Sequence, residues 1–390
     1  MTILETVVLG LIAVAAYPYV GYPVLLYLLS RRHSEPAPQA THEWPTVTLV
    51  ISAFNEEAVI EDKIRNVREL TYPHDRLRVL IGSDGSSDAT VRKARLVAIG
   101  APYVEITDFN SRRGKPAVLH DLIERAESDI VALSDANTMF EPGAIERLAR
   151  WFANPLVGAV CGRLRLTSRD SMDRSEVLYW RFETWLKARE NRLGAVLGAN
   201  GGIYAFRRAA YVPIPPDTIT DDFVIPMLIR TLGYHIVFDE SAVATEEVAP
   251  KVAHEFTRRI RIGAGNLQAL WRTQSLLRPS AGWTAFAYWS HKVLRWSAPL
   301  WLLVAILMSL LRIQSPILKS VALGGAVVFA SAAAGWFLER AGRTAPRILA
   351  APYAFVAMNL ALLIGGVQLL QGKNHARWSR TPRGVEVPDS

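Results

Sequence analysis

The stretch VLIGSDGSSDAT, residues 79–90, runs from an apolar strand pattern directly into small residues and two carboxylates. Residues 79–81 form the continuous apolar run that is expected of a parallel strand covered on both faces. Ser87 or Asp88 is a suitable N-cap for a helix that follows. The stretch therefore predicts a strand, a loop and a helix, with Asp84 on the loop at the strand's carboxyl end, where open α/β sheets bind their ligands.

The same alternation of strand and helix patterns extends from Pro45 to about Pro250, which predicts an α/β fold with a mostly parallel central sheet. The expected strands are residues 46–52, 77–82, 103–107, 129–135 and 157–162. The expected helices lie near residues 56–70, 88–99, 115–127 and 142–153. Because polar residues follow three of the strands, one crevice at their carboxyl ends is the expected ligand site.

Two apolar regions flank this part of the chain. Residues 5–29 have no charge after Glu5, and about 20 apolar residues suffice to span a bilayer, so residues 1–32 are expected to hold a retained transmembrane helix. Three more transmembrane helices are expected in residues 293–372, at about 294–312, 316–338 and 347–371. The basic residues after the first helix predict, by the positive-inside rule, a multi-pass protein of the inner (plasma) membrane whose polar middle is cytoplasmic.

The remaining segments connect these regions. Residues 33–45 contain several prolines and are expected to form a linker to the soluble domain, residues 46–250. Residues 251–292 mix arginine with apolar residues and tryptophan, which is typical of amphipathic helices in the membrane interface. Residues 373–390 form a basic tail, and the sequence leaves its side of the membrane open.

Charge and cysteine content narrow the classes of partner. The net charge of +8 comes from scattered basic residues, so membrane lipid is an expected partner and nucleic acid is not. The single cysteine, Cys161, excludes an intrachain disulfide and a cysteine-based zinc site. His254 and His291 have no partner pattern and are expected to be structural.

LSDANT, residues 133–138, places Asp135 and Asn137 two positions apart directly after a buried strand. On a tight loop this spacing can direct two oxygen ligands at one hard cation, which would also hold a diphosphate. An Asx turn that caps the helix beginning near Pro142 explains the same residues. The sequence leaves both interpretations open.

Two further motifs place charged residues at helix starts. In RRGKPAVLH, residues 112–120, Lys115 could meet a phosphate or be a solvated surface lysine. In TITDDFVIPMLIR, residues 218–230, a helix capped by Thr220 would have Asp221 and Asp222 in its first turn. Helix stabilisation explains both carboxylates, and a general base is the alternative.

Two other motifs also have a functional and an ordinary interpretation. Small residues precede an expected strand in GANGGIYAFRR, residues 198–208. They are compatible with the close approach of a ligand to the backbone or with an ordinary turn. RRIRIGAG, residues 258–265, could clamp a diphosphate through Arg258 or Arg261, or face anionic lipid.

In this order the motifs resemble those of the membrane-bound family 2 glycosyltransferases, which include synthases of cellulose, hyaluronan, chitin oligosaccharides and poly-N-acetylglucosamine. The resemblance runs from Val47 to Trp296, and the motifs that carry it are ISAFNEE, SDGSSD, RRGKP, SDANT and TDD. It implies a GT-A fold, which is Rossmann-like, and a nucleotide-sugar donor, usually a UDP-sugar. It also implies a divalent metal, Mg²⁺ or Mn²⁺, and inversion at the anomeric carbon.

The resemblance also implies a role for each matched residue. The residues implied for the nucleotide sugar are Phe54, Glu56, Asp84, Lys115, Asp135, Arg258 and Arg261. Those implied for the acceptor are Asn200, Gly201 and Asp221. Asp135 and Asn137 would hold the metal, and Asp222 would be the catalytic base.

Two departures from the family pattern bear on the product. The D-x-D motif is D-x-N here, so Asn137 offers a neutral oxygen where a carboxylate would add charge. The Q-x-x-R-W motif of the processive enzymes is replaced by RRIRI, with Arg258, Arg261 and Ile262 at the Gln, Arg and Trp positions. That tryptophan helps to seat the acceptor terminus, and its absence favours transfer of one sugar over polymer synthesis.

The leading hypothesis is therefore sugar transfer to a lipid-linked or growing glycan acceptor at the cytoplasmic face of the membrane. Processive polysaccharide synthesis coupled to export is the alternative within the enzyme class, and it would need more helices or a homo-oligomer to line a channel. A non-catalytic membrane protein that senses or transports nucleotides is the alternative of another class. Such a sensor needs Asp84 and Lys115 but has no use for a base at Asp222.

Overall fold

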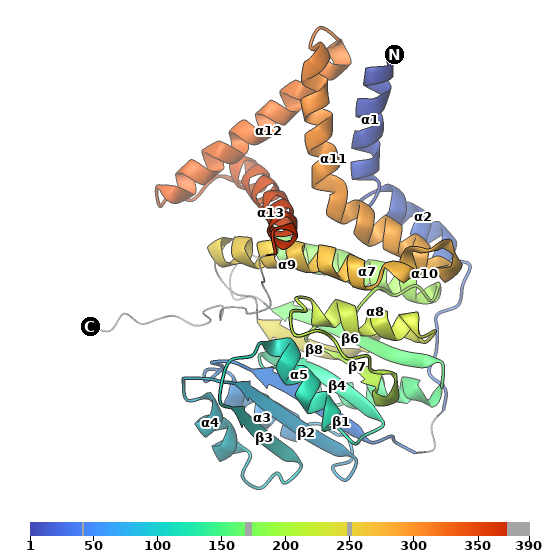
Figure 1. The fold of residues 1–390 in the computed structure, drawn as a ribbon, viewed down its shortest axis with the longest axis vertical. Helices are drawn as coiled ribbons and strands as arrows, with labels where there is room; N and C mark the ends of the chain where they lie inside the picture. Colours follow the sequence, from blue (N-terminus) through green and yellow to red (C-terminus); the bar gives the residue numbers. More distant parts are fainter. Residues whose placement is uncertain (41–42, 168–173, 248–251, 373–390) are drawn as a thin grey trace. The chain divides into compact units, whose positions relative to one another are not determined.

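The computed structural model describes residues 1–40, 43–167, 174–247 and 252–372 of the chain (Figure 1). These residues fall into two compact units, which are described separately. The sheet unit holds the described part of residues 28–251 together with residues 271–285. The helical unit holds residues 1–27, 252–270 and 286–372.

An eight-stranded sheet forms the centre of the sheet unit, with the strand order β3-β2-β1-β4-β7-β6-β8-β5. The strands are β1 (Val47–Ala53), β2 (Leu77–Asp84), β3 (Val104–Phe109), β4 (Ile130–Asp135), β5 (Thr138–Phe140), β6 (Val157–Thr167), β7 (Tyr204–Arg207) and β8 (His235–Glu247). β1, β2, β3 and β4 are parallel to one another, and β6 is parallel to β8. β7 and β5 run against their neighbours. The prediction of a mostly parallel α/β sheet is therefore confirmed.

Helices cover both faces of the parallel half of this sheet. The helices of the sheet unit are α3 (Ile60–Arg68), α4 (Thr90–Val97), α5 (Lys115–Glu124), α6 (Ala144–Ala149), α7 (Arg174–Arg192) and α8 (Asp221–Thr231). Leu49 and Ile51 of β1 share one core with side chains of α3, α4 and α6, whereas α5 packs on the other face. Gly82 allows this approach, because a Cβ there would lie 2.6 Å from a methyl group of Val118 in α5. Burial on both faces is the physical reason for the continuous apolar runs in β1, β2 and β4.

The sequence analysis did not predict α7, a helix of 19 residues, or β8, a strand of 13 residues. The pairing of β8 with β6 shifts register where Gly162 lies opposite Asp239 and Arg163 lies opposite Val243. The polar segment between Asp239 and Val243 therefore interrupts the apolar pattern in the middle of the strand. A bulge of this kind breaks the two-residue period from which strands are recognised.

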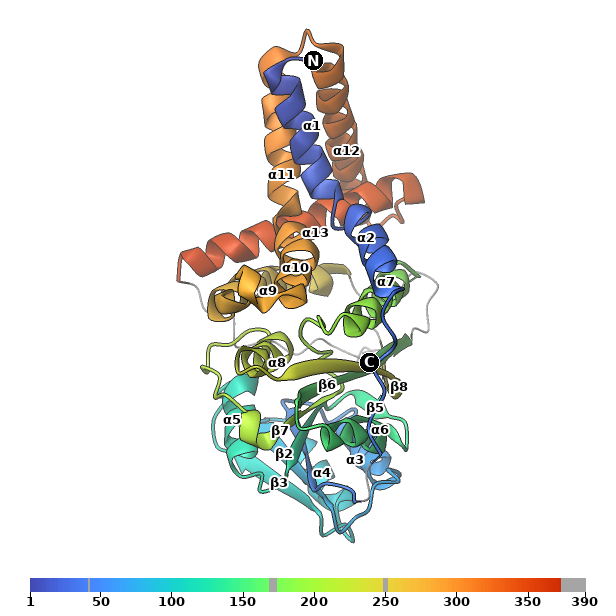
Figure 2. The same cartoon turned by 90° about the vertical axis from the view of Figure 1, so that its right-hand side faces the viewer.

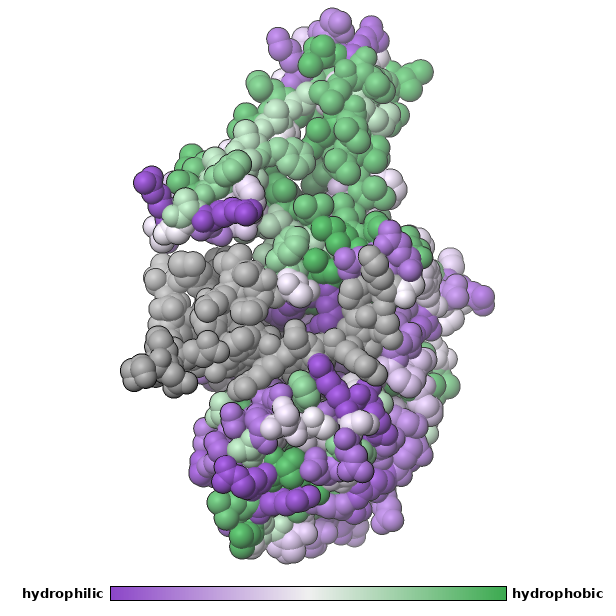
Figure 3. All heavy atoms as spheres, turned by 60° about the vertical axis from the view of Figure 1, so that its left-hand side comes forward, coloured by the Kyte–Doolittle hydropathy of each residue, from purple (hydrophilic) through white to green (hydrophobic). Residues whose placement is uncertain are grey.

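The helical unit contains long apolar helices (Figure 2). Its elements are α1 (Ile3–Ala16), the first part of α2 (Gly21–Ser30), most of α9 (Val252–Arg272), a π-helix (Tyr288–Val293), α11 (Leu294–Ser309), α12 (Pro316–Arg340) and α13 (Arg347–Leu370). The short helix α10 (Trp283–Ala287) leads into the π-helix. Three stretches are long and apolar enough to cross a membrane, namely Trp283–Arg312, Pro316–Arg340 and Arg347–Leu370. Figure 3 shows hydrophobic side chains over the surface of these helices.

The single helix expected over residues 5–29 is instead two helices. α1 and α2 are bent by 53° at a break of four residues, and together they would count as one broken span. Pro18 lies in the break and has no N–H to continue the helix ladder. The ring of Tyr17 packs against Gly21, where a Cβ would lie 2.6 Å from Tyr17 Cδ2. A larger residue at Gly21 would therefore not fit against this break.

Two glycines allow α9 and α13 to cross at backbone contact. A Cβ at Gly263 would lie 2.4 Å from the carbonyl oxygen of Leu362, and a Cβ at Gly365 would overlap the carbonyl oxygen of Ile260. Such small residues at a crossing permit the van der Waals contact that holds helices together in an apolar medium.

Gly365→Leu is expected to destabilise the helical unit by about 1–3 kcal/mol, the usual scale for overpacking, because the side chain has no space at the crossing. Gly366→Leu is the matched control, since a Cβ at Gly366 meets no atom within 4 Å and gains the same helix propensity. Thermal unfolding of both purified variants in one detergent measures the difference. Equal melting temperatures would contradict the close crossing.

Candidate active site

The carboxyl ends of three parallel strands form one edge of the sheet. Ser52 of β1 pairs in register with Gly82 of β2 and with Asp135 of β4, so the loops that follow begin side by side. Asn55, just after β1, has a φ of 54°, the left-handed conformation that non-glycine residues rarely adopt. Asn55 Oδ1 accepts the Ser87 N–H at 2.9 Å, which ties this strained residue to the loop after β2.

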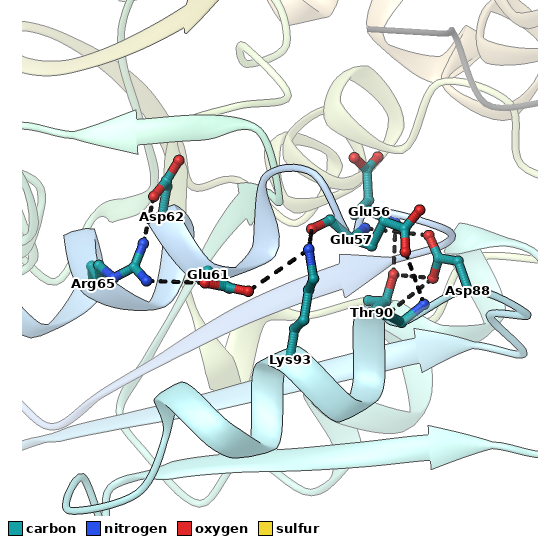
Figure 4. A network of polar contacts seen from close by, with 9 residues as sticks. Glu56, Glu57, Glu61, Asp62, Arg65, Asp88, Thr90 and Lys93 are labelled. Carbon is teal, nitrogen blue, oxygen red and sulfur yellow. Dashed lines mark hydrogen bonds and ion pairs between the residues drawn. The ribbon is translucent and has the colours of Figure 1, made fainter. Parts of the chain in front are cut away.

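A network of polar contacts joins the loops after β1 and β2 (Figure 4). Thr90 Oγ1 accepts the Glu56 N–H at 2.8 Å, and Asp88 accepts the N–H of Thr90. Lys93 Nζ donates to the carbonyl oxygen of Glu57 at 2.9 Å. These contacts fix the two loop backbones, whereas the Glu56 carboxylate points away from Asp88 and Thr90 in the figure.

Asp84 is the last residue of β2 and not, as the sequence predicted, a residue of the following loop, and it is buried with 3% of its surface exposed. Its two oxygens accept the N–H groups of Arg113, at 2.6 Å, and Gly114, at 2.9 Å. Gly114 has a φ of 95°, so the chain turns sharply here before α5 begins. Asp84 therefore anchors the loop before Lys115, and its two oxygens have acceptor capacity left for a ligand.

A cavity of about 620 Å³ lies beside this anchored loop. It is lined by Ser111, Arg112, Arg113, Ala117, His120, Asp121, Ile214 and Pro216. The volume of this cavity falls in the range of small-molecule sites.

One of the lining residues also reaches the end of β1. The Arg112 guanidinium lies 4.0 Å from the centre of the Phe54 ring, a cation–π arrangement that covers the end of β1.

Lys115, at the start of α5, brings the loop after β4 together with the start of α8. Lys115 Nζ lies 2.7 Å from Asp135 Oδ1 and 3.5 Å from Asp221 Oδ2. Burial disfavours the charged lysine, but Asp135 and Asp221 outweigh it and raise the pKa of Lys115 above its usual value. The interpretation of Lys115 as a solvated surface residue is therefore wrong, because its ammonium is held between two carboxylates.

Asp222 is in the first turn of α8, with Thr220 at the N-cap position. Asp222 Oδ1 accepts the Phe223 N–H at 3.0 Å. Burial and the neighbouring charge of Asp221 raise the pKa of Asp222 to about 6, and the charge of Lys115 opposes this rise. A carboxylate with such a pKa can accept a proton near neutral pH.

Asn200 and Gly201 lie close to the Asp222 carboxylate, and they differ in their contacts with it. Asn200 is buried, and its Nδ2 donates to the carbonyl oxygen of Gly162 at 2.8 Å. A Cβ at Gly201 would lie 3.2 Å from Asp222 Oδ2, so the missing side chain keeps that oxygen uncrowded. Gly201 therefore leaves space beside the Asp222 carboxylate. Asn200 fixes the neighbouring backbone through its hydrogen bond to Gly162.

The expected metal ligands lie on one loop, and only one of them is a carboxylate. Asn137 Nδ2 donates to Glu246 Oε1 of β8 at 2.8 Å, so the Asn137 amide is held at the sheet edge. Among the described residues, no group of three or more His, Cys, Asp or Glu side chains could hold a metal ion by itself. The buried Asp221 Oδ2 lies 3.5 Å from Lys115 Nζ and accepts no hydrogen bond within the described part of the chain. Asp135 with this oxygen nearby suits a hard cation that takes its other ligands from a bound diphosphate and water.

Sequence analysis missed Lys63 of α3, which is fully buried beneath the same loop. Lys63 Nζ donates to Ser134 Oγ at 2.7 Å and to the carbonyl oxygen of Thr138. Burial lowers the pKa of Lys63 to about 7, although the charge of Asp135 opposes this shift. The sequence did contain an indication of this burial, because Lys63 lies on the same face of the helix as the apolar Ile60, Ile64 and Val67. Lys63 therefore fixes both ends of the loop that carries Asp135 and Asn137.

Arg258 and Arg261 are in α9, within the helical unit. The side chain of His254 lies outside the described residues. The diphosphate role of both arginines stays a prediction.

Comparisons with known proteins relate this arrangement to one group of enzymes. Residues 48–212 match the sequence model of the family described as Glycosyl transferase family 2. The chain is 26% identical over 232 residues to the poly-beta-1,6-N-acetyl-D-glucosamine synthase of Staphylococcus aureus (strain COL), covering 58% of this chain and 56% of that protein. It is 25% identical over 242 residues to the probable glycosyltransferase YdaM of Bacillus subtilis (strain 168), covering 57% of this chain and 56% of that protein. The chain thus spans about half the length of the curated relatives that it matches.

A solved structure covers more of the chain. The mannosyltransferase PcManGT from Pyrobaculum calidifontis, in complex with GDP-Man and Mn²⁺, matches 95% of this chain and 100% of its own with a TM-score of 0.72. The sequence identity is 22%, so this likeness shows the fold. The prediction of a GT-A fold is confirmed.

Proposed function

Because residues 48–212 form a glycosyl transferase family 2 domain, we propose that this chain moves a sugar from a nucleotide-sugar donor to a lipid-linked or growing glycan acceptor, with inversion at the anomeric carbon. The observation that carries the proposal is the meeting of Lys115, Asp135 and Asp221 at the sheet edge, with Asp222 in the next position of α8. A cation for the diphosphate, an acidic metal ligand and a proton acceptor are the groups that such a transfer needs.

The donor would lie over the carboxyl ends of β1, β2 and β4, next to the loop of residues 111–114. Phe54, Glu56 and Asp84 would bind the nucleoside, and Lys115 would direct its ammonium at the diphosphate. Asp135 and Asn137 would hold Mg²⁺ or Mn²⁺, which neutralises charge on the leaving diphosphate. The Mn²⁺ and GDP-Man of PcManGT support a metal and a nucleoside diphosphate sugar without deciding between GDP and UDP.

The acceptor would lie on the side of Asp222, near Gly201 and Asn200. In a single displacement the acceptor hydroxyl attacks the anomeric carbon while the nucleoside diphosphate leaves from the opposite face. Asp222 would take the hydroxyl proton, and Asp221 would help to place the acceptor. The arginines of α9, Arg258 and Arg261, would contact the diphosphate.

The proposed reaction takes place at a membrane. The three apolar helices after residue 282 and the broken pair α1 and α2 support a multi-pass protein. We place residues 46–250 on the cytoplasmic side of the inner membrane, with residues 251–292 at its surface. The acceptor would then approach from the lipid phase or from a glycan held there.

Polymer synthesis is the second candidate, favoured by the name of the Staphylococcus aureus relatives. RRIRI in α9 has no tryptophan at the position that seats a growing chain in the processive enzymes, and this favours transfer of one sugar. Product length, measured by mass spectrometry of the reaction on a labelled acceptor, decides between them.

The proposal is tested by screening the purified full chain for hydrolysis of a panel of nucleotide sugars, with Mg²⁺, with Mn²⁺ and with a chelator. We expect turnover of one donor class that the chelator removes and added metal restores. Donor binding without any hydrolysis or transfer would instead support the nucleotide sensor. Turnover that resists the chelator would remove the metal from the proposal.

The pH dependence of kcat/KM provides a separate check on Asp222. A general base acts in its deprotonated form, and the pKa of Asp222 is raised to about 6 by burial and by Asp221. We therefore expect kcat/KM to be low below pH 6, to rise through about pH 6 and to level off above it. A profile that is flat between pH 4.5 and pH 8 would show that no group with this pKa limits the reaction.

A further inference from the structure

The loop that carries the expected metal ligands joins two strands that are not neighbours in the sheet. β4 ends at Asp135 and β5 begins at Thr138, so only two residues connect them. In the order of the described strands, however, β7, β6 and β8 lie between β4 and β5. The two ends of this loop are therefore not held together by the hydrogen bonds of a strand ladder.

Lys63 of α3 supplies a connection between these two strand ends. Its Nζ donates to Ser134 Oγ at 2.7 Å, next to the end of β4, and to the carbonyl oxygen of Thr138, the first residue of β5. The same nitrogen lies 4.5 Å from the centre of the Phe140 ring, a cation–π contact at the other end of β5. One side chain therefore ties together the two strands that flank the loop.

Packing alone does not explain a lysine at this position. Lys63 has no exposed surface, and it lies on the same helix face as the buried Ile60, Ile64 and Val67. An apolar residue of similar volume would fill this space without the free-energy cost of burying an amine. The lysine differs from such a residue by the two hydrogen bonds that it donates to the strand ends.

We propose that Lys63 is a positioning residue of the metal site, which holds the loop with Asp135 and Asn137 in the conformation that binds a divalent cation. Lys63 acts through Ser134 and Thr138, on either side of the ligands. This inference rests on the proposed function, because it needs the metal that accompanies the donor diphosphate. Groups that orient metal ligands from outside the coordination sphere contribute roughly 10–100-fold to metal affinity.

The charge of Lys63 makes the sign of the effect informative. Lys63 is close enough to Asp135 for the two charges to interact. By charge alone, removal of a positive group near Asp135 would strengthen the binding of a divalent cation, since like charges repel. Weaker binding after the removal of Lys63 would therefore come from the lost position of the loop.

The test measures Mn²⁺ binding to the purified full chain and to its Lys63→Met variant. Electron paramagnetic resonance reports the free Mn²⁺ in each titration, which is carried out without nucleotide, with UDP and with GDP. We expect the dissociation constant for Mn²⁺ to rise by about 10–100-fold in Lys63→Met. Ser134→Ala removes one of the two hydrogen bonds and should raise this constant by about 5-fold, the scale of one hydrogen bond.

Asn66→Ala is the matched control on the same helix. Asn66 Nδ2 donates to the carbonyl oxygen of Phe140 at 2.8 Å, and Asn66 Oδ1 accepts the Phe140 N–H at 2.8 Å. This variant loosens α3 at the end of β5 that is remote from the loop. Thermal unfolding should show its loss of stability, whereas its affinity for Mn²⁺ should stay close to the original value.

Unchanged or tighter Mn²⁺ binding in Lys63→Met would overturn this inference, as would an equal loss of affinity in Asn66→Ala. Either result, with Mn²⁺ bound to the unchanged chain, would leave the proposed function standing. If the unchanged chain binds no Mn²⁺ with either nucleotide, the proposed metal site is wrong, and this inference is wrong with it. If Lys63→Met does not fold, Ser134→Ala decides, because it leaves α3 unchanged, and full Mn²⁺ affinity in that variant would overturn the inference.

Discussion

Asp222→Asn is expected to lower sugar transfer by about 10²–10⁴-fold, the usual contribution of a general base. Asparagine keeps the shape of the side chain and its hydrogen bond to the Phe223 N–H, but its amide does not take up a proton. Because Lys115 and Asp135 are untouched, donor binding should stay close to its original value. The loss should therefore appear in kcat, with little change in the KM for the donor.

Two measurements make this result interpretable. Calorimetric titration with the nucleoside diphosphate reports donor binding, and Asp62→Asn, on the exposed part of α3, controls for the chemistry of the substitution. The acid limb of kcat/KM near pH 6 should also disappear in Asp222→Asn. Near-normal turnover of this variant would mean that the base is elsewhere, and Asp221 would be the next residue to replace.

Lys115→Met is the second substitution with a large expected effect, a loss of at least about 10²-fold in kcat/KM. Methionine preserves most of the side-chain volume but removes the cation that lies between Asp135 and Asp221. Both the diphosphate and the two carboxylates lose their positive partner, so donor binding should weaken together with turnover. Because the charge of Lys115 lowers the pKa of Asp222, its removal should also move the acid limb above pH 6.

This pH shift separates a direct role of Lys115 from a general loss of structure. Lys319→Met, at an exposed position of α12, is the matched control and should leave the acid limb in place. Far-ultraviolet circular dichroism would confirm that both variants are folded. A Lys115→Met variant with unchanged donor KM and an unshifted acid limb would contradict the proposed contact with the diphosphate.

Local sequence patterns predicted the parallel half of the sheet because each strand there is buried on both faces. The apolar runs of β1, β2 and β4 begin and end within about two residues of the expected ranges, since the following polar loops mark their ends. β8 escaped prediction because its bulge between Asp239 and Val243 breaks the apolar pattern. The bend between α1 and α2 was not predicted because a hydropathy count registers apolar residues and does not register the helix break at Pro18.

The candidate site was only partly readable from the sequence. Asp135, Asp221 and Lys115 are far apart in the chain, and no local pattern states that they meet. Their grouping came from the family resemblance, and the structure adds the contacts between them. Local patterns also did not show that the Asp84 carboxylate accepts two hydrogen bonds from the backbone N–H groups of Arg113 and Gly114.

The placement of Asp221 and Asp222 at consecutive positions of α8 has a consequence for how the proposed activity could diversify. One residue faces the lysine on the donor side and the next is the proposed base on the acceptor side, and both move with one helix. A substitution that tilts α8 would alter donor affinity and turnover together. Changes in sugar or acceptor preference are therefore easier to acquire in the surrounding loops than in α8. New specificities would have to evolve while the position of this helix stays the same.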